Sequence, residues 1–90
     1  MKRLRILVHG KVQNVGFRSY VKNLADKLSL NGWVRNNPDG SVEILVEGTE
    51  RLLEEFLDYC KKGPPLSRID KVDVFEEKIS EKFKRFEILF

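Results

Sequence analysis

The most informative stretch of the sequence is Gly10-Lys11-Val12-Gln13-Asn14-Val15-Gly16-Phe17-Arg18, which joins a predicted strand to a predicted helix. Before it, apolar and polar residues alternate from Arg3 to His9, which predicts a strand with one apolar face. After it, apolar side chains recur at spacings of three and four from Phe17 to Leu28, which predicts a helix. A bend between a strand and a helix leaves several N–H groups pointing at one spot, where the helix dipole favours negative charge. Arg18 adds a planar fork suited to two oxygens of a phosphate-like anion, so the stretch predicts a small anion-binding loop.

The middle of the chain is predicted to form a β-hairpin. Its strands run from Trp33 to Asn36 and from Ser41 to Glu47. Asn37-Pro38-Asp39-Gly40 joins them, because Pro38 presets φ and Gly40 tolerates a positive φ. The inward side chains of the second strand are expected to be Val42, Ile44 and Val46.

The second half of the chain repeats the helix-then-strand order. Thr49 is expected to cap a second helix, and Gly63-Pro64-Pro65 to end it. The apolar side of this helix is formed by Leu52, Leu53, Phe56, Leu57 and Cys60. A strand from Ile69 to Glu77 follows, with Val72 and Val74 predicted to point inward. A last strand is predicted to place on one face Phe86, Ile88 and Phe90.

The predicted order of elements is β-α-β-β-α-β with one more strand at the end. This order is typical of an α+β fold, the ferredoxin-like βαββαβ sandwich. We expect an antiparallel sheet with two helices on one face and an extra C-terminal strand. The chain has 90 residues, so residues 1–90 are expected to form a single domain. Many unrelated activities use this fold, so it does not by itself indicate a function.

Composition excludes several classes of function. The chain is 41% hydrophobic and 34% charged with a net charge of +3, and no apolar run approaches the roughly 20 residues of a membrane span. The charged start, Met1 to Arg5, precedes no long apolar stretch, so neither a signal peptide nor a membrane partner is expected. One cysteine and one histidine predict no disulfide, no metal site and no cofactor, and they favour a reducing, cytoplasmic location.

Two motifs resemble those of a known family. GKVQNVGFR, residues 10–18, resembles the acylphosphatase signature GxVQGVGFR, and GWVRNNPDGSV, residues 32–42, resembles the second motif of that family, GWVxNxxDGxV. The matching segments extend from the first strand to the last, so the resemblance implies a single acylphosphatase-like domain. Asn14 stands where the family usually has the middle glycine, and asparagine visits the left-handed region more readily than other non-glycine residues.

The resemblance implies hydrolysis of acyl phosphates to carboxylate and phosphate. Arg18 would be the phosphate-binding catalytic arginine, and Asn36 would hold the attacking water. The expected substrate-binding residues, acting largely through main-chain N–H groups, are Gln13, Asn14, Val15, Gly16, Phe17 and Arg18. Asn37 is a neighbouring candidate for the water, but strand alternation turns it the other way and assigns it to the turn. The reaction needs no metal, and a small acyl phosphate is the expected partner.

Other chemistry-bearing side chains have simpler interpretations. His9 is expected to be a partly exposed strand residue rather than a general base, and Cys60 to belong to the core. Lys11 and Arg35 are expected to be solvated surface residues. Packing is the expected role of the aromatic side chains Phe17, Tyr20 and Trp33.

Two other functions fit the same fold. An RNA-binding module of this plan exposes aromatic side chains on its central strands. The outward positions predicted here contain acids and no aromatics: Arg3, Arg5, Leu7, His9, Ser41, Glu43, Leu45 and Glu47. The sequence therefore favours no nucleic-acid partner. A non-catalytic anion-binding domain is the other alternative.

A monomer is expected, although the last strand, with Phe83, Phe86 and Phe90, leaves an edge that could pair.

Overall fold

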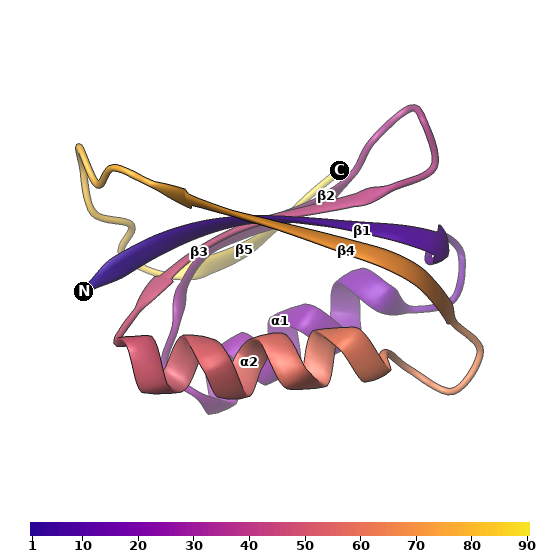
Figure 1. The fold of residues 1–90 in the computed structure, drawn as a ribbon, viewed down its shortest axis with the longest axis horizontal. Helices are drawn as coiled ribbons and strands as arrows, with labels where there is room; N and C mark the ends of the chain where they lie inside the picture. The colour runs from indigo at the N-terminus through magenta and orange to yellow at the C-terminus, as the bar shows by residue number, and fades with distance from the viewer.

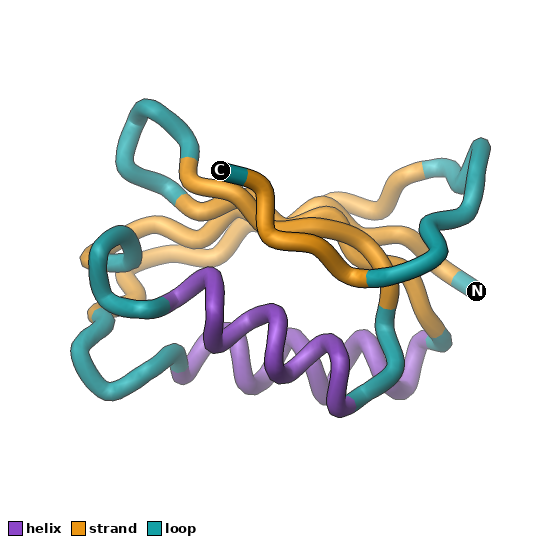
Figure 2. The backbone as a smooth tube through the Cα atoms, turned by 180° about the vertical axis from the view of Figure 1, so that it is seen from behind, coloured by secondary structure: helices purple, strands orange, loops and turns teal.

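The computed structural model describes residues 1–90 as a two-layer molecule, with a sheet on one side and two helices on the other (Figure 1). The strands are β1 (Lys2–Lys11), β2 (Asn31–Asn36), β3 (Val42–Gly48), β4 (Arg68–Glu77) and β5 (Phe86–Leu89), and the helices are α1 (Phe17–Lys27) and α2 (Glu50–Lys62). Both helices cover the same face of the sheet, as the view from behind also shows (Figure 2). The predicted element order and the ferredoxin-like architecture are confirmed.

The order of strands in the sheet is β4-β1-β3-β2-β5. The first four pair antiparallel, but β5 runs parallel to β2, with Gly32 opposite Phe86 and Val34 opposite Ile88. The expected antiparallel sheet is thus confirmed for these four strands, and the extra C-terminal strand, β5, adds a parallel pairing that makes the sheet mixed. The reason is topological: the chain reverses direction after β4 and crosses to the opposite edge of the sheet. Its neighbour there, β2, already runs the same way.

The hydrophobic core lies between the sheet and the helices. The fully buried inward side chains of β1 and β3 are Ile6, Val8, Val42, Ile44 and Val46. The helices contribute Val21, Ala25, Leu53, Phe56 and Cys60. Two residues predicted to point inward are exposed. Val74 lies opposite Ile6 and so on the helix side, but β4 is an edge strand and leaves Val74 40% exposed. Phe90 follows the end of β5 and is fully exposed.

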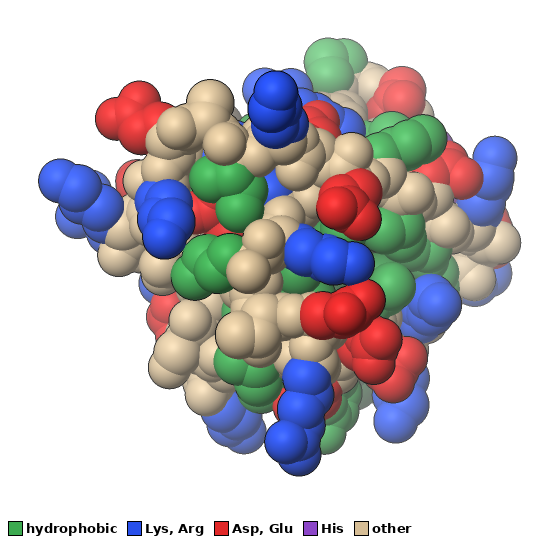
Figure 3. Space-filling view, turned by 60° about the vertical axis from the view of Figure 1, so that its left-hand side comes forward, with side chains coloured by type: hydrophobic (Ala, Val, Ile, Leu, Met, Phe, Trp, Pro, Cys, Tyr) green, Lys and Arg blue, Asp and Glu red, His purple; other side chains and the backbone are tan.

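The other face of the sheet is covered by ion pairs. The guanidinium of Arg3 donates to Glu47 through Nε at 2.8 Å and Nη2 at 2.6 Å, and both side chains are buried. Other ion pairs on this face are Arg5–Glu43, Arg5–Glu77 and Arg35–Glu43. Charges of opposite sign thus neutralise one another across the strands. Positive and negative side chains are also interspersed on the face seen in Figure 3.

The two helices begin differently. Thr49 caps α2 as predicted, with its Oγ1 accepting from the Leu52 N–H at 3.5 Å. Gly63, in the left-handed region at φ 69°, ends the same helix. Helix α1 begins after Gly16, which has no side chain to cap it, and its first turn contains no acidic residue. The N-terminus of α1 is therefore left without a side-chain acceptor, at the place where the loop after β1 meets the end of β2.

Candidate functional site

A small pocket lies where the loop after β1, the first turn of α1 and the end of β2 meet. Its lining residues are Val12, Asn14, Gly16, Phe17, Arg18, Ser19 and Asn36. Its volume is about 90 Å³. Liquid water occupies about 30 Å³ per molecule, so the pocket has room for a group of only a few heavy atoms.

The backbone angles of the loop favour main-chain hydrogen-bond donors that face this pocket. Asn14 and Gly16 both have left-handed backbone angles, φ 62° and φ 77°. Such residues between ordinary ones curl the chain so that successive N–H groups point into one concavity. The N–H groups of the first helical turn have no acceptor within a helix, and no side chain caps them here. The partial positive charge of the helix N-terminus adds to these donors, so the pocket favours an anion.

Gly10 and Gly16 serve the loop in different ways. A Cβ at Gly10 would lie 2.1 Å from the carbonyl oxygen of Arg68, so glycine lets β1 pass close to β4 where their register shifts. A Cβ at Gly16 would meet no heavy atom within 4 Å, and its requirement is the positive φ alone.

Arg18 reaches the pocket from the first turn of α1. Its guanidinium Nη1 donates to the Leu89 carbonyl at 3.4 Å. Its Cζ lies 4.8 Å from the centroid of the Phe90 ring. Two contacts from the end of the chain therefore support this guanidinium. A guanidinium has five N–H donors, and the bond to Leu89 uses one of them.

Asn36 is the last residue of β2 and lines the same pocket. Its Oδ1 is buried and has no hydrogen-bond partner in the protein. No other buried side-chain oxygen or nitrogen in the chain lacks a partner. Buried polar atoms are almost always paired, so a lone acceptor at a pocket wall indicates a place for a donor from outside the protein.

The predicted site residues separate into two groups. Asn14, Gly16, Phe17, Arg18 and Asn36 line one pocket. Gln13 and Val15 do not line it. The Val15 side chain packs against the core, and the Gln13 amide donates to the carbonyls of Asn37 and Ser41.

Two lining residues, Val12 and Ser19, were not predicted. Ser19 could have been found from the sequence, because its N–H is also in the first turn of α1. Val12 gave no such signal.

The remaining candidates lie away from the pocket. His9 Nε2 is 3.1 Å from an oxygen of Asp73 on the outer face of the sheet, where it is partly exposed as predicted. Arg35 pairs with Glu43 and stands over the Trp33 ring. Cys60 is buried in the core, and burial raises the pKa of its thiol.

Asn37 belongs to the turn, as predicted, with its side chain donating to Ser41 Oγ at 3.2 Å.

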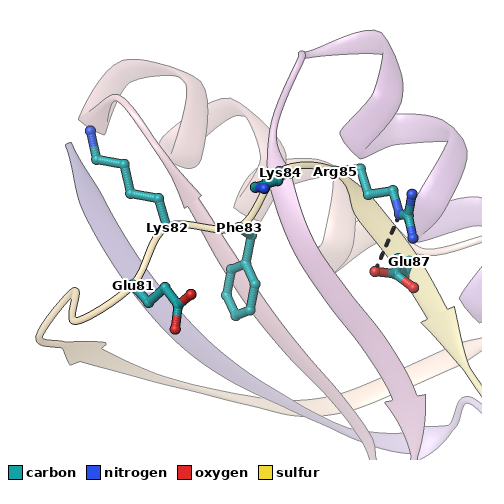
Figure 4. A pocket seen from close by; sticks show the side chains of 6 residues that line it. All are labelled: Glu81, Lys82, Phe83, Lys84, Arg85 and Glu87. Atoms are coloured by element: carbon teal, nitrogen blue, oxygen red, sulfur yellow. Dashed lines mark ion pairs between the residues drawn. The ribbon is translucent and has the colours of Figure 1, made fainter.

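The largest cavity, about 380 Å³, lies elsewhere. It is lined by residues of the loop between β4 and β5 and the start of β5, namely Glu81, Lys82, Phe83, Lys84, Arg85 and Glu87. Figure 4 shows these side chains spread along the loop rather than converging on one point, with Arg85 paired to Glu87 at 3.3 Å. No group of three or more His, Cys, Asp and Glu side chains is placed to hold a metal ion, and no helix is long and apolar enough to cross a membrane.

Comparisons with known proteins identify a family that this chain resembles. A profile of the acylphosphatase family matches residues 4–88. An acylphosphatase from Bacillus licheniformis is 48% identical over 90 residues, covering 100% of both chains. An acylphosphatase from Methylococcus capsulatus is 43% identical over 89 residues, which is 99% of this chain and 97% of that one.

Solved structures give the same result. The crystal structure of the acylphosphatase from Bacillus subtilis superposes with a TM-score of 0.96 at 46% identity, covering 100% of each chain. Full-length HypF, in its phosphate- and nucleotide-bound form, matches 99% of this chain with 12% of its own length, at a TM-score of 0.92 and 40% identity.

Proposed function

The chain belongs to the acylphosphatase family and is an acyl phosphate hydrolase, and we propose that Arg18 and Asn36 carry out the hydrolysis in the pocket at the start of α1. The substrates of this reaction have the form R–CO–OPO₃²⁻. Water replaces the carboxylate on phosphorus, and the products are a carboxylate and inorganic phosphate.

The chemistry explains why the pocket needs no strong acid or base. The leaving group is a carboxylate whose conjugate acid has a pKa of roughly 4–5, near that of glutamic acid. It leaves at neutral pH without taking a proton. The phosphoryl transition state is loose, so catalysis rests mainly on placing water in line and on stabilising the equatorial oxygens. A cation, main-chain donors and a polar amide are sufficient for those two tasks.

Arg18 is proposed to bind the phosphoryl oxygens together with main-chain N–H groups of the loop and first helical turn that line the pocket, those of Asn14, Gly16 and Phe17. Its support from Leu89 and Phe90 leaves most of its donors available. A planar fork can bind two oxygens at once, which a lysine ammonium cannot do in the same way. These groups supply the positive charge that the transferring phosphoryl group needs, so no metal ion or cofactor is part of the proposal.

Asn36 is proposed to hold the attacking water, and its unpaired buried Oδ1 is the observation that carries this assignment. A water molecule that donates to Oδ1 would be oriented with a lone pair free to attack phosphorus. Because an amide does not titrate, the water would stay oriented over a wide range of pH. No covalent intermediate is expected.

We also propose that the enzyme acts as a cytoplasmic monomer without a nucleic-acid partner. The outer-face arginines, Arg3 and Arg5, are already bound to carboxylates and are not free to contact phosphates of RNA. The net charge of +3 suits a small anionic substrate better than a polyanion, which usually binds a clustered basic stripe.

Kinetics on benzoyl phosphate test the two assignments. Asn36→Ala is expected to lower kcat by about 100-fold or more, since removing one catalytic hydrogen-bonding group typically costs that much. The competitive inhibition constant of inorganic phosphate should stay within about threefold of the wild-type value, because Arg18 and the loop N–H groups that bind phosphate are unchanged. Arg18→Lys should weaken both turnover and phosphate binding. Asn23→Ala, an exposed asparagine on α1, is the matched control. Wild-type turnover in Asn36→Ala, or loss of phosphate binding in that variant, would refute the assignment of Asn36.

A further inference from the structure

One side chain joins the loop after β1 to the turn that follows β2. Gln13 lies in the loop after β1, and its Nε2 donates to the carbonyls of Asn37 at 2.8 Å and Ser41 at 2.9 Å. These carbonyls belong to the two ends of the turn between β2 and β3. The amide therefore connects the anion-binding loop to the hairpin that carries Asn36.

The turn is already closed without Gln13. Its own main chain makes two hydrogen bonds, from Asn37 N–H to the Ser41 carbonyl at 2.8 Å and from Gly40 N–H to the Asn37 carbonyl at 3.1 Å. Each carbonyl has two lone pairs. The Gln13 amide takes the second acceptor site of both, so it docks the loop onto a turn that is formed independently.

Glutamine suits this position chemically. Two carbonyls require two donated hydrogens, and a primary amide nitrogen carries two. A glutamate of the same shape would present only acceptors to both carbonyls. An asparagine is one methylene shorter.

The neighbours of this contact are the residues of the pocket. Gln13 directly precedes Asn14, which lines the anion side, and Asn37 directly follows Asn36. The two Gln13 hydrogen bonds therefore connect the residue before Asn14 to the residue after Asn36. A displacement of about 1 Å in a reacting group can lower a rate about 100-fold.

We propose that Gln13 is a positioning residue for the hydrolysis, which keeps the water held by Asn36 in line with the phosphate bound in the loop. This inference rests on the proposed roles of Arg18 and Asn36. Gln13 itself touches neither the phosphate nor the water through its side chain. Replacing Gln13 should disturb the alignment of Asn36 with the loop more than it disturbs the groups that bind phosphate. The replacement should therefore lower kcat more than it lowers phosphate affinity.

The test measures kcat and the phosphate inhibition constant for Gln13→Glu and Gln13→Met on benzoyl phosphate. Glutamate keeps the shape without the donors, and methionine keeps the length without any strong polar atom. Both variants are expected to lower kcat by about 10- to 100-fold, with phosphate inhibition within about threefold of wild type. Rates are normalised to the folded fraction from urea unfolding. Thr49→Ala, which removes the N-terminal cap of α2 at the other end of β3, controls for a general loss of stability.

Three results would overturn the inference. The first is wild-type kcat in both Gln13 variants, and the second is an equal loss of kcat and phosphate affinity. The third is failure of both variants to fold, which would mark a purely structural role. In an Asn36→Ala background, adding Gln13→Met should lower kcat by less than about threefold, because the aligned group is already gone. If Asn36→Ala alone leaves kcat unchanged, the proposed function fails instead, so the two failures are distinguishable.

Discussion

Arg18 and Leu89 are joined by a hydrogen bond, from the guanidinium Nη1 to the main-chain carbonyl, although 71 positions separate them in the sequence. The ring of Phe90 lies against the same guanidinium. The support comes from β5, which runs parallel to β2 and places Leu89 opposite Arg35, the residue before Asn36. The parallel pairing of the last strand therefore has a consequence at the site: it brings the end of the chain to the arginine on α1.

The first prediction concerns Phe90. A cation–π contact at an exposed site contributes about 0.5–1 kcal/mol. If this contact holds Arg18 ready to bind phosphate, Phe90→Ala should raise the inhibition constant of phosphate by about two- to fivefold. Phe90→Trp should preserve it, because an indole ring binds a cation at least as well. The measurement is the inhibition constant of inorganic phosphate. Equal constants for wild type and Phe90→Ala would show that the ring does not hold Arg18.

The second prediction concerns the buried ion pair on the outer face. Glu47 accepts from Arg3 and from the Phe83 N–H, the latter at 2.7 Å, and it is 2% exposed. Glu47→Ala leaves the buried guanidinium without its partner, which typically costs about 3–5 kcal/mol of the free energy of unfolding. Urea unfolding measures this loss.

The exposed pair Arg68–Asp70 is the control for Glu47, since these side chains are 69% and 52% exposed. Asp70→Ala should change the free energy of unfolding by less than about 1 kcal/mol. A similar small change in Glu47→Ala would contradict the structural role of the buried pair.

The third prediction concerns acid stability. Hydrogen bonds from the Ser41 hydroxyl and N–H to the Asp39 carboxylate lower its pKa below 3.8 in the folded protein. The unfolded chain therefore binds the proton more readily, and the stabilisation is present above about pH 4 and lost as pH falls through the folded pKa. Asp39→Asn does not titrate. The difference in the free energy of unfolding between wild type and Asp39→Asn should be constant from pH 5 to 8. Below pH 4, wild type should lose stability relative to the variant. A difference that stays constant down to pH 2 would contradict this account.

The fourth prediction concerns Asn14, whose backbone is left-handed at φ 62°. Asn14→Gly should keep the loop and near-normal turnover, because glycine adopts this conformation freely. Asn14→Ala should lower the free energy of unfolding by about 1 kcal/mol, since alanine enters the left-handed region only at a cost. Urea unfolding and benzoyl phosphate kinetics on both variants give the comparison. Equal stability of the two variants would show that the loop does not need the left-handed angle.

Local patterns predicted most of the fold. The alternation in β1, the turn Asn37-Pro38-Asp39-Gly40 and the Thr49 cap each depend on residues close in sequence, and all three are confirmed. The pocket positions of Arg18 and Asn36 followed from the resemblance of two motifs to a family, and both residues line one pocket.

Long-range contacts could not be predicted in the same way. The pairing of Arg3 with Glu47 turns two outward strand residues, which looked solvated, into a buried pair, because β1 and β3 place them opposite each other. The bonds of Gln13 to the hairpin, like the contacts of Arg18 with the last strand, depend on how distant segments meet. No periodicity or spacing in the sequence contains that information.

The central claim is that the phosphate of the substrate binds at the loop before α1, against Arg18 and across from Asn36. A titration of the ¹⁵N-labelled protein with inorganic phosphate, followed by two-dimensional NMR, tests it most directly. Saturable shifts are predicted for the N–H groups of residues 14–18 and for the side-chain amide of Asn36, and they should be strongly weakened in Arg18→Lys. Shifts confined to residues 82–85, which line the larger basic cavity, would contradict the account.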